Sequence, residues 1–128
     1  MHIGTMLVGI AVLHLLVGGV LYARVLQAIA SEGVLATVVD FGDRAAAFWF
    51  VITGLTLLLL GVCIRDVEAR GLQIPAPLAP GLALLTLAMV LPMPATGAWC
   101  LLPVAWLAYR RHRVDVRTRS ASVPAHVS

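Results

Sequence analysis

The first apolar run of the chain begins at residue 3 and reads IGTMLVGIAVLHLLVGGVLYA, residues 3–23, without any Asp, Glu, Lys or Arg. As an α-helix this run is about 31 Å long, which matches a hydrocarbon core of about 30 Å. His14 stands in its middle, and an imidazole at that depth costs free energy unless protein groups pair with it or use it. The run therefore predicts a membrane-spanning helix and makes His14 the first candidate for function.

The composition of the whole chain supports membrane insertion. The 128 residues are 61% hydrophobic and only 12% charged, whereas soluble domains carry about 25% charged residues. A soluble core cannot hide so much apolar surface in so short a chain. We therefore expect a single integral membrane domain.

Further apolar runs complete the predicted fold. Residues 45–64 make a second helix of membrane-spanning length. Residues 74–109 carry no charge but would form a helix of about 54 Å, too long for one crossing. The string LPMPATG at 91–97 interrupts them, because Pro and Gly break helices. The sequence thus predicts an all-α, transmembrane four-helix bundle with helices at 3–23, 45–64, 76–92 and 97–110.

The segments between these helices have their own expected structure. Residues 25–44 are predicted to form a loop with an interfacial helix near 24–31 and a short element near 34–41. A charged turn is expected at 65–73, and Pro103 is expected to kink or adjust the last helix. Residues 1–112 then form the membrane domain, and 113–128 form a basic, disordered cytoplasmic tail.

The distribution of arginine predicts the orientation. With both termini in the cytoplasm, Arg65, Arg70 and the five arginines of the tail face inward, while Arg24 and Arg44 face outward. This asymmetry agrees with the positive-inside rule. The basic tail is expected to face anionic lipid head groups rather than nucleic acid. The first helix is expected to be retained, because it lacks the basic start of a signal peptide.

Small residues recur every seven positions in the first two helices. Gly4, Ala11 and Gly18 form one stripe, which also contains His14, and the second helix carries Ala47, Gly54 and Gly61. Small residues allow membrane helices to approach closely. We therefore expect these helices to be in contact and His14 to face protein, with Thr53, Thr56 or the carbonyl of residue 10 as its hydrogen-bond partner. A ligand-contacting or proton-handling role for His14 is the alternative.

A polar cluster precedes the second helix. Asp40, Asp43 and Arg44 are followed by an aromatic segment that contains Trp49 and Phe50. Asp43 suits a helix N-terminus, so a capped helix with an interfacial aromatic belt is one interpretation. The other is a polar rim above an apolar cavity that moves protons on a lipophilic substrate. Asp43 is expected about 13–15 Å above His14, so cooperation requires residues 34–44 to fold inward.

These clusters give the candidate site residues. The catalytic candidates are His14, Asp40, Asp43 and Arg44, and the candidate contacts to a lipophilic ligand are Trp49, Phe50, Thr53, Trp99 and Trp106. Cys63 and Cys100 are expected near opposite membrane faces and to serve packing. No cofactor and no metal are expected, because no second buried His or Cys is placed to assist His14.

Three strings of the sequence carry a family resemblance: GIAVLHLLVGGVLYA, FGDRAAAFWFVITGLTLLLLG and LPMPATGAWCLLPVAWLA. Together they resemble a family of small bacterial four-helix membrane proteins that is catalogued as a domain of unknown function. The resemblance extends to about residue 112 and implies a multi-pass protein of the bacterial inner membrane, without implying an activity. By size and hydropathy the chain is also loosely similar to DoxX-like proteins.

Three functions remain open from the sequence. The first is a membrane-embedded enzyme or binder for a lipophilic small molecule, with cofactor-independent isomerase or cyclase chemistry at His14. The second is a non-catalytic accessory membrane protein, and the third is a small transporter or channel subunit. A homo-oligomer is expected, because four short helices leave little room for a ligand site.

Overall fold

The computed structural model describes residues 2–32, 42–92 and 97–122, with residues 119–122 described by their backbone alone. Every regular element in these residues is helical, as the sequence predicts. The chain divides into two compact units, Thr5–Val62 and the remainder of the chain, which are described separately. The elements in chain order are α1 (Ile3–Leu21), α2 (Ala23–Glu32), α3 (Asp43–Ala69), α4 (Leu78–Val90), the 3-10 helix η1 (Gly97–Cys100) and α5 (Leu101–Ser122).

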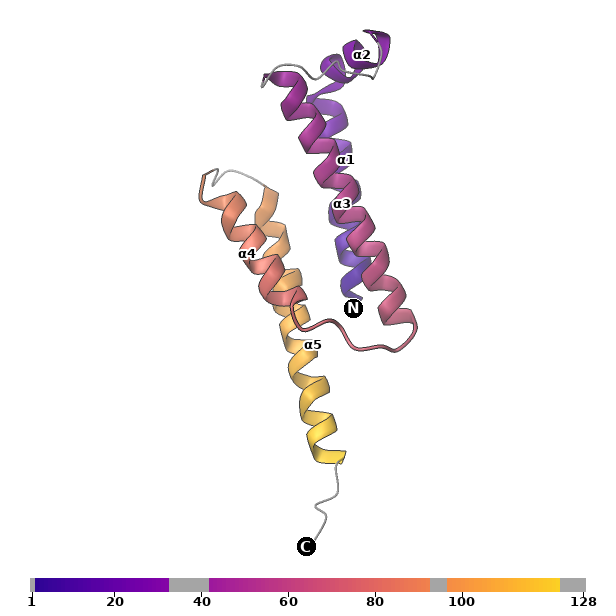
Figure 1. Cartoon of the computed structure of the whole chain (residues 1–128), viewed down its shortest axis with the longest axis vertical. Helices are drawn as coiled ribbons and strands as arrows, with labels where there is room; N and C mark the ends of the chain where they lie inside the picture. Colours follow the sequence, from indigo (N-terminus) through magenta and orange to yellow (C-terminus); the bar gives the residue numbers. More distant parts are fainter. Residues whose placement is uncertain (1, 33–41, 93–96, 123–128) are drawn as a thin grey trace, which may run out of the picture. The chain divides into compact units, whose positions relative to one another are not determined.

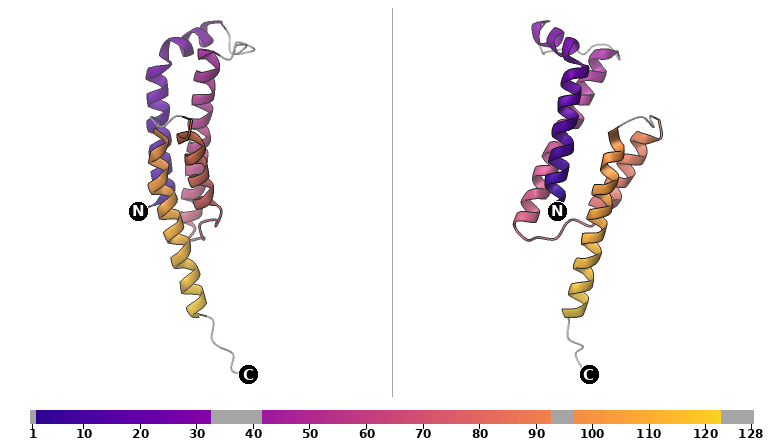
Figure 2. Two further views of the ribbon diagram at one scale, coloured as in Figure 1. Left: turned by 90° about the vertical axis from the view of Figure 1, so that its left-hand side faces the viewer. Right: turned by 180° about the vertical axis from the view of Figure 1, so that it is seen from behind.

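Helices α1 and α3 run side by side in opposite directions (Figures 1 and 2). Their small residues form the contact. The ring of Phe50 lies over Gly18, and the side chains of Leu15 and His14 lie against Gly54. A β-carbon placed on Gly61 would be 2.8 Å from the backbone nitrogen of Val8, so only glycine allows this approach. The predicted contact between the two small-residue stripes is confirmed.

A break at Tyr22 separates α1 from α2. The backbone nitrogen of Tyr22 still donates to the carbonyl of Gly18 at 2.9 Å, and α2 then leaves the direction of α1 (Figure 1). Helix α2 confirms the short helix that the sequence predicts at 24–31, and none of its residues is buried. The element predicted near 34–41 lies outside the described residues. Across that segment, Glu32 and Arg44 form an ion pair of 2.7 Å.

Helix α3 is longer than the predicted helix at 45–64. It begins at Asp43 and continues to Ala69, so the turn expected at 65–73 is helical over most of its length. The charged segment contains no helix breaker before Gly71, which explains the extension. Gly71 has a φ of 67°. Its backbone nitrogen donates to the backbone carbonyl of Glu68, and the backbone nitrogen of Leu72 donates to the backbone carbonyl of Val67. This pattern is a Schellman motif, in which glycine takes the left-handed position at low cost.

Helices α4 and α5 form an antiparallel pair (Figure 2). Helix α4 covers most of the predicted helix at 76–92. Its buried positions recur on one face, as do those of α5. This periodicity is typical of helices that pack along one stripe. The residues buried in this pair are Ala79, Leu82, Thr86 and Val90 of α4 and Leu101, Val104, Ala105 and Ala108 of α5.

The last helix differs from the prediction at both ends. Residues 97–100 form a 3-10 helix, and α5 begins at Leu101. Pro103 therefore lies in the first turn, where a missing N–H removes no helical hydrogen bond and no kink is required. Helix α5 also continues beyond residue 110 to Ser122, although a disordered tail is predicted from 113. No Gly or Pro occurs between Pro103 and Pro124, so nothing in the sequence stops the helix earlier.

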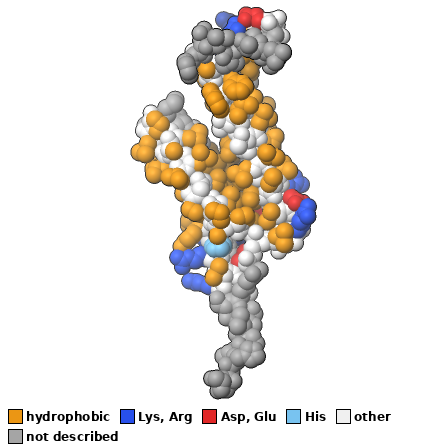
Figure 3. All heavy atoms as spheres, viewed as in Figure 1, with side chains coloured by type: hydrophobic (Ala, Val, Ile, Leu, Met, Phe, Trp, Pro, Cys, Tyr) orange, Lys and Arg blue, Asp and Glu red, His pale blue; other side chains and the backbone are white. Residues whose placement is uncertain are grey.

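The buried positions combine small residues with some Leu, Ile and Val, and many large apolar side chains are exposed. The residues buried between helices include many Ala and Gly, while many Leu, Val and Trp side chains are exposed. Figure 3 shows hydrophobic side chains over most of one face, with charged side chains toward the ends of the helices. Helices α1 and α3 are long and apolar enough to cross a membrane, and α4 is apolar but shorter, with 13 residues.

Candidate functional site

The imidazole of His14 makes both its hydrogen bond and its ring contact with one residue of α3, Phe50. Its Nε2 atom lies 3.0 Å from the carbonyl oxygen of Phe50, and the two rings are stacked with centroids 3.9 Å apart and planes 8° apart. A carbonyl oxygen only accepts, so Nε2 must carry the hydrogen. Tyr22 completes the aromatic group, with its ring centroid 5.6 Å from that of Phe50. His14 faces protein, as its position on the small-residue stripe predicts.

The two threonines that were expected to form a hydrogen bond with His14 form hydrogen bonds within α3 instead. The hydroxyl of Thr53 donates to the carbonyl of Trp49 at 2.8 Å, and that of Thr56 donates to Ile52 at 2.8 Å. Both bonds lie within one turn of α3, a common arrangement for Ser and Thr in apolar helices. The structure therefore shows the Phe50 carbonyl as the hydrogen-bond partner of His14, in place of a threonine hydroxyl or the carbonyl of residue 10, which the sequence predicted.

Of the residues predicted to form a polar rim, which are Asp40, Asp43 and Arg44, the structure describes two. Asp43 is the first residue of α3, as its role at a helix N-terminus predicts, and Arg44 pairs with Glu32. Asp40 lies outside the described residues. His14 lies at the level of Phe50, which is about 10 Å along α3 from Asp43. The structure does not bring Asp43 to the imidazole.

The five predicted ligand contacts are divided between the two compact units and are described within each unit. Phe50 stacks on His14, whereas Trp49 is 64% exposed and packs edge-on against Phe48. Trp99 lies in η1 and Trp106 in α5, and both side chains are exposed. Thr53 is bonded within its own helix. The aromatic residues near the helix ends are therefore arranged as an outward-facing set.

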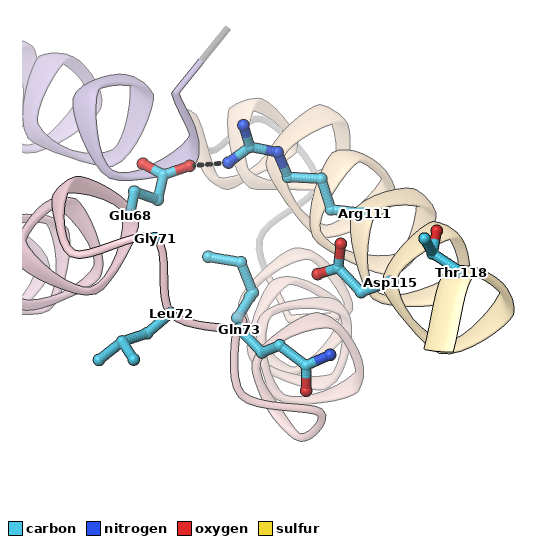
Figure 4. A pocket seen from close by; sticks show the side chains of 8 residues that line it. Glu68, Gly71, Leu72, Gln73, Arg111, Asp115 and Thr118 are labelled. Carbon is cyan, nitrogen blue, oxygen red and sulfur yellow. Dashed lines mark hydrogen bonds and ion pairs between the residues drawn. The ribbon is translucent and has the colours of Figure 1, made fainter. Parts of the chain in front are cut away.

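Glu68 is the most deeply buried carboxylate among the described ion pairs. Its side chain is 2% exposed. The backbone nitrogens of Ile3 and Gly4 donate to its two oxygens, each at 2.9 Å. Arg111 of α5 pairs with the same carboxylate (Figure 4), and Nδ1 of His2 lies 3.9 Å away. The helix dipole at the start of α1 adds to the favourable field at this anion.

Sequence reasoning missed this buried carboxylate, because it assigned residues 65–73 to a turn. A signal was present. Glu68 follows Ala47, Gly54 and Gly61 at the same seven-residue spacing, which places it on the face of α3 that meets α1. Arg111 likewise follows the buried Val104 and Ala108 on one face of α5.

An open pocket of about 410 Å³ adjoins the Glu68–Arg111 pair. Asp115 points into the same space, and Gln73 and Thr118 stand at its edges (Figure 4). Both oxygens of Glu68 already accept hydrogen bonds from the protein. The arrangement is therefore suited to holding the start of α1, the end of α3 and the middle of α5 together.

A second, apolar groove lies on α4 and α5. Its volume is about 520 Å³. Alanines and a proline form part of its lining, Trp106 and Tyr109 supply aromatic surface, and His112 is the one basic side chain among its lining residues. Trp106 is the one predicted ligand contact that lies here. The lining residues are Ala76, Ala79, Pro80, Ala83, Leu102, Ala105, Trp106, Tyr109 and His112.

Metal-binding geometry is not found in the described part of the chain, where no group of three or more His, Cys, Asp or Glu residues could hold an ion. Cys63 and Cys100 are both free and exposed. Neither of the two pockets is lined by His14.

The fold and these sites define a small all-helical protein with two helices long and apolar enough to cross a membrane. Residues 1–115 match the model of DUF6463, a family of unknown function, and the chain belongs to that family. This match agrees with the resemblance to a domain of unknown function. No curated protein and no solved structure matches the chain.

Proposed function

We propose that this protein is a multi-pass protein of the bacterial inner membrane that binds a lipophilic molecule in the groove on α4 and α5. The observation that carries the proposal is the groove itself. It is mostly apolar, contains two large aromatic side chains and has one basic residue among its lining, His112. Ligand sites of this kind combine apolar walls with a few polar groups that fix orientation.

The membrane location is supported by the distribution of residue sizes. Exposed Leu and Val side chains cover the helices, and Gly and Ala fill the contacts between them. In water such a surface would be an aggregation hazard, whereas in lipid it is the expected outside of a helical bundle. Four crossings by α1, α3, α4 and α5, with both termini in the cytoplasm, accommodate the arginine distribution.

Binding is favoured over catalysis by the contacts of His14. Its Nε2–H is engaged by the Phe50 carbonyl and its ring by the Phe50 ring, which is the geometry of a group that joins two helices. Isomerase or cyclase chemistry at His14 stays a prediction, as does self-association of the bundle. The groove on α4 and α5 requires neither.

The test is a lipid titration followed by native mass spectrometry of the full chain in detergent. The probe is palmitoyl-oleoyl-phosphatidylcholine, whose acyl chains match an apolar groove. We expect one saturable site, and we expect Ala83→Leu, which adds volume inside the groove, to weaken binding about tenfold, the effect of a clash worth about 1.4 kcal/mol.

The matched control is Ala88→Leu, because Ala88 is also an exposed alanine of α4 but does not line the groove. Its affinity for the lipid should equal that of the unmodified chain. Equal binding by the Ala83→Leu and Ala88→Leu variants would refute the groove as the binding site.

A further inference from the structure

We propose that the lipophilic ligand of this groove carries an anionic head group, which Arg110 and Arg113 bind. This inference rests on the proposed function and names its ligand class: an amphiphile with one or two long hydrocarbon chains and a phosphate or carboxylate head. The groove supplies the apolar surface, and the two guanidinium groups supply the charge.

The two arginines stand beside the aromatic residues of the groove. The guanidinium carbon of Arg110 lies 4.7 Å from the centroid of the Trp106 ring. That of Arg113 lies 5.1 Å from the centroid of the Tyr109 ring. Trp106 and Tyr109 both line the groove. Neither arginine lines the groove itself, and each guanidinium group lies instead over a ring that does.

The charge of these two arginines is not balanced by carboxylates. Within the described residues, Arg44, Arg70 and Arg111 each have a carboxylate within ion-pairing distance, but no such pair involves Arg110 or Arg113. The neighbouring acid, Asp115, lines the other pocket with Arg111. His112, which stands between them in the sequence, lines the groove and can also form hydrogen bonds. Among the described residues, the two arginines therefore carry positive charge that is not paired with a carboxylate.

A positive rim at the end of an apolar groove is complementary to an anionic lipid. The phosphate of an anionic lipid accepts charge-assisted hydrogen bonds from the guanidinium groups and leaves a net opposite charge beside them, whereas in a zwitterionic lipid such as phosphatidylcholine the choline ammonium offsets the charge of the phosphate. Each basic side chain near an anionic lipid surface contributes about 1 kcal/mol. Two of them, partly screened by salt, give a preference on the order of tenfold.

The test compares two lipids with the same palmitoyl and oleoyl chains, phosphatidylglycerol and phosphatidylcholine, in the same mass-spectrometric titration. We expect phosphatidylglycerol to bind about tenfold more tightly. The double variant Arg110→Gln/Arg113→Gln should lose this preference, with a smaller change in its affinity for phosphatidylcholine than for phosphatidylglycerol. The double variant Arg65→Gln/Arg70→Gln removes the same charge elsewhere and should keep the preference.

The outcomes separate the two proposals. Equal affinity for both lipids, with both weakened by Ala83→Leu, would overturn the anionic head group and leave the groove. An equal loss of preference in the two double variants would show a nonspecific effect of net charge and overturn the role of Arg110 and Arg113. Displacement of phosphatidylglycerol by millimolar inorganic phosphate would mean that the arginines bind phosphate without the lipid.

Discussion

His14 and Phe50 form a two-point contact across α1 and α3: the rings are stacked 3.9 Å apart, and the imidazole Nε2 donates to the Phe50 carbonyl at 3.0 Å. The carbonyl can accept this bond in addition to a helical one, because its oxygen has two lone pairs. In an apolar surrounding every polar group needs a partner within the protein. The pair therefore gives the imidazole at mid-helix a structural explanation.

We expect His14→Ala to destabilise the protein. The change removes a hydrogen bond and a ring contact between α1 and α3, and we expect the free energy of unfolding in detergent to fall by about 1–3 kcal/mol. Equilibrium unfolding followed by circular dichroism measures this. Leu13→Ala is the control, since Leu13 is 60% exposed. Equal stability of the two variants would contradict the structural role of His14.

Gly61 and Gly9 should respond in opposite ways to alanine. A β-carbon on Gly61 would be 2.8 Å from the backbone nitrogen of Val8, whereas a β-carbon on Gly9 meets nothing within 4 Å. Gly61→Ala should cost about 1–3 kcal/mol of unfolding free energy, because backbone cannot move aside cheaply. Gly9→Ala should be neutral or stabilising by up to about 1 kcal/mol, because alanine is the better helix former. A similar unfolding midpoint for the two variants would be inconsistent with the close approach of α1 and α3.

The contact between α1 and α3 is predictable from sequence because it depends on small-residue spacing. Gly18, Gly54 and Gly61 recur at intervals that place them on one face of each helix, and close packing of membrane helices needs small residues. The partner of His14 is not predictable in the same way. It is a backbone carbonyl, and every residue of α3 has one.

The errors at the helix ends have a different origin. The charged residues at 65–69 and 111–118 follow the ends of apolar runs, and the sequence analysis therefore assigned them to a turn and to a disordered tail. A helix ends at a helix-breaking residue or at a C-cap, as at Gly71. A change from apolar to polar residues therefore does not by itself locate the end of a helix. The groove on α4 and α5 was missed for a third reason. Several of its lining residues are alanines. Whether an alanine lines a groove depends on how the neighbouring helix packs, which the sequence does not show.

The proposed orientation predicts which side of the membrane each loop faces. We start from a chain in which Cys63 and Cys100 are replaced by alanine, and introduce Ser31→Cys in α2 or Gln73→Cys after α3. Both positions are exposed. A membrane-impermeant maleimide added to intact cells without an outer membrane should label residue 31 and not residue 73. The reverse pattern would place both termini outside, and labelling of both sites would exclude this topology.

The ion pair of Glu68 and Arg111 should be worth more than an ion pair at the surface. The side chain of Glu68 is 2% exposed, and Glu68→Gln leaves Arg111 without its anion and weakens the bonds from Ile3 and Gly4. A double-mutant cycle with Arg111→Gln should give a coupling free energy of about 1–3 kcal/mol, a value discounted because Arg111 is partly exposed. The control cycle uses Asp66→Asn and Arg70→Gln, an exposed i,i+4 pair, and should give less than about 0.5 kcal/mol. Equal coupling in the two cycles would mean that burial of Glu68 adds nothing to its attraction for Arg111.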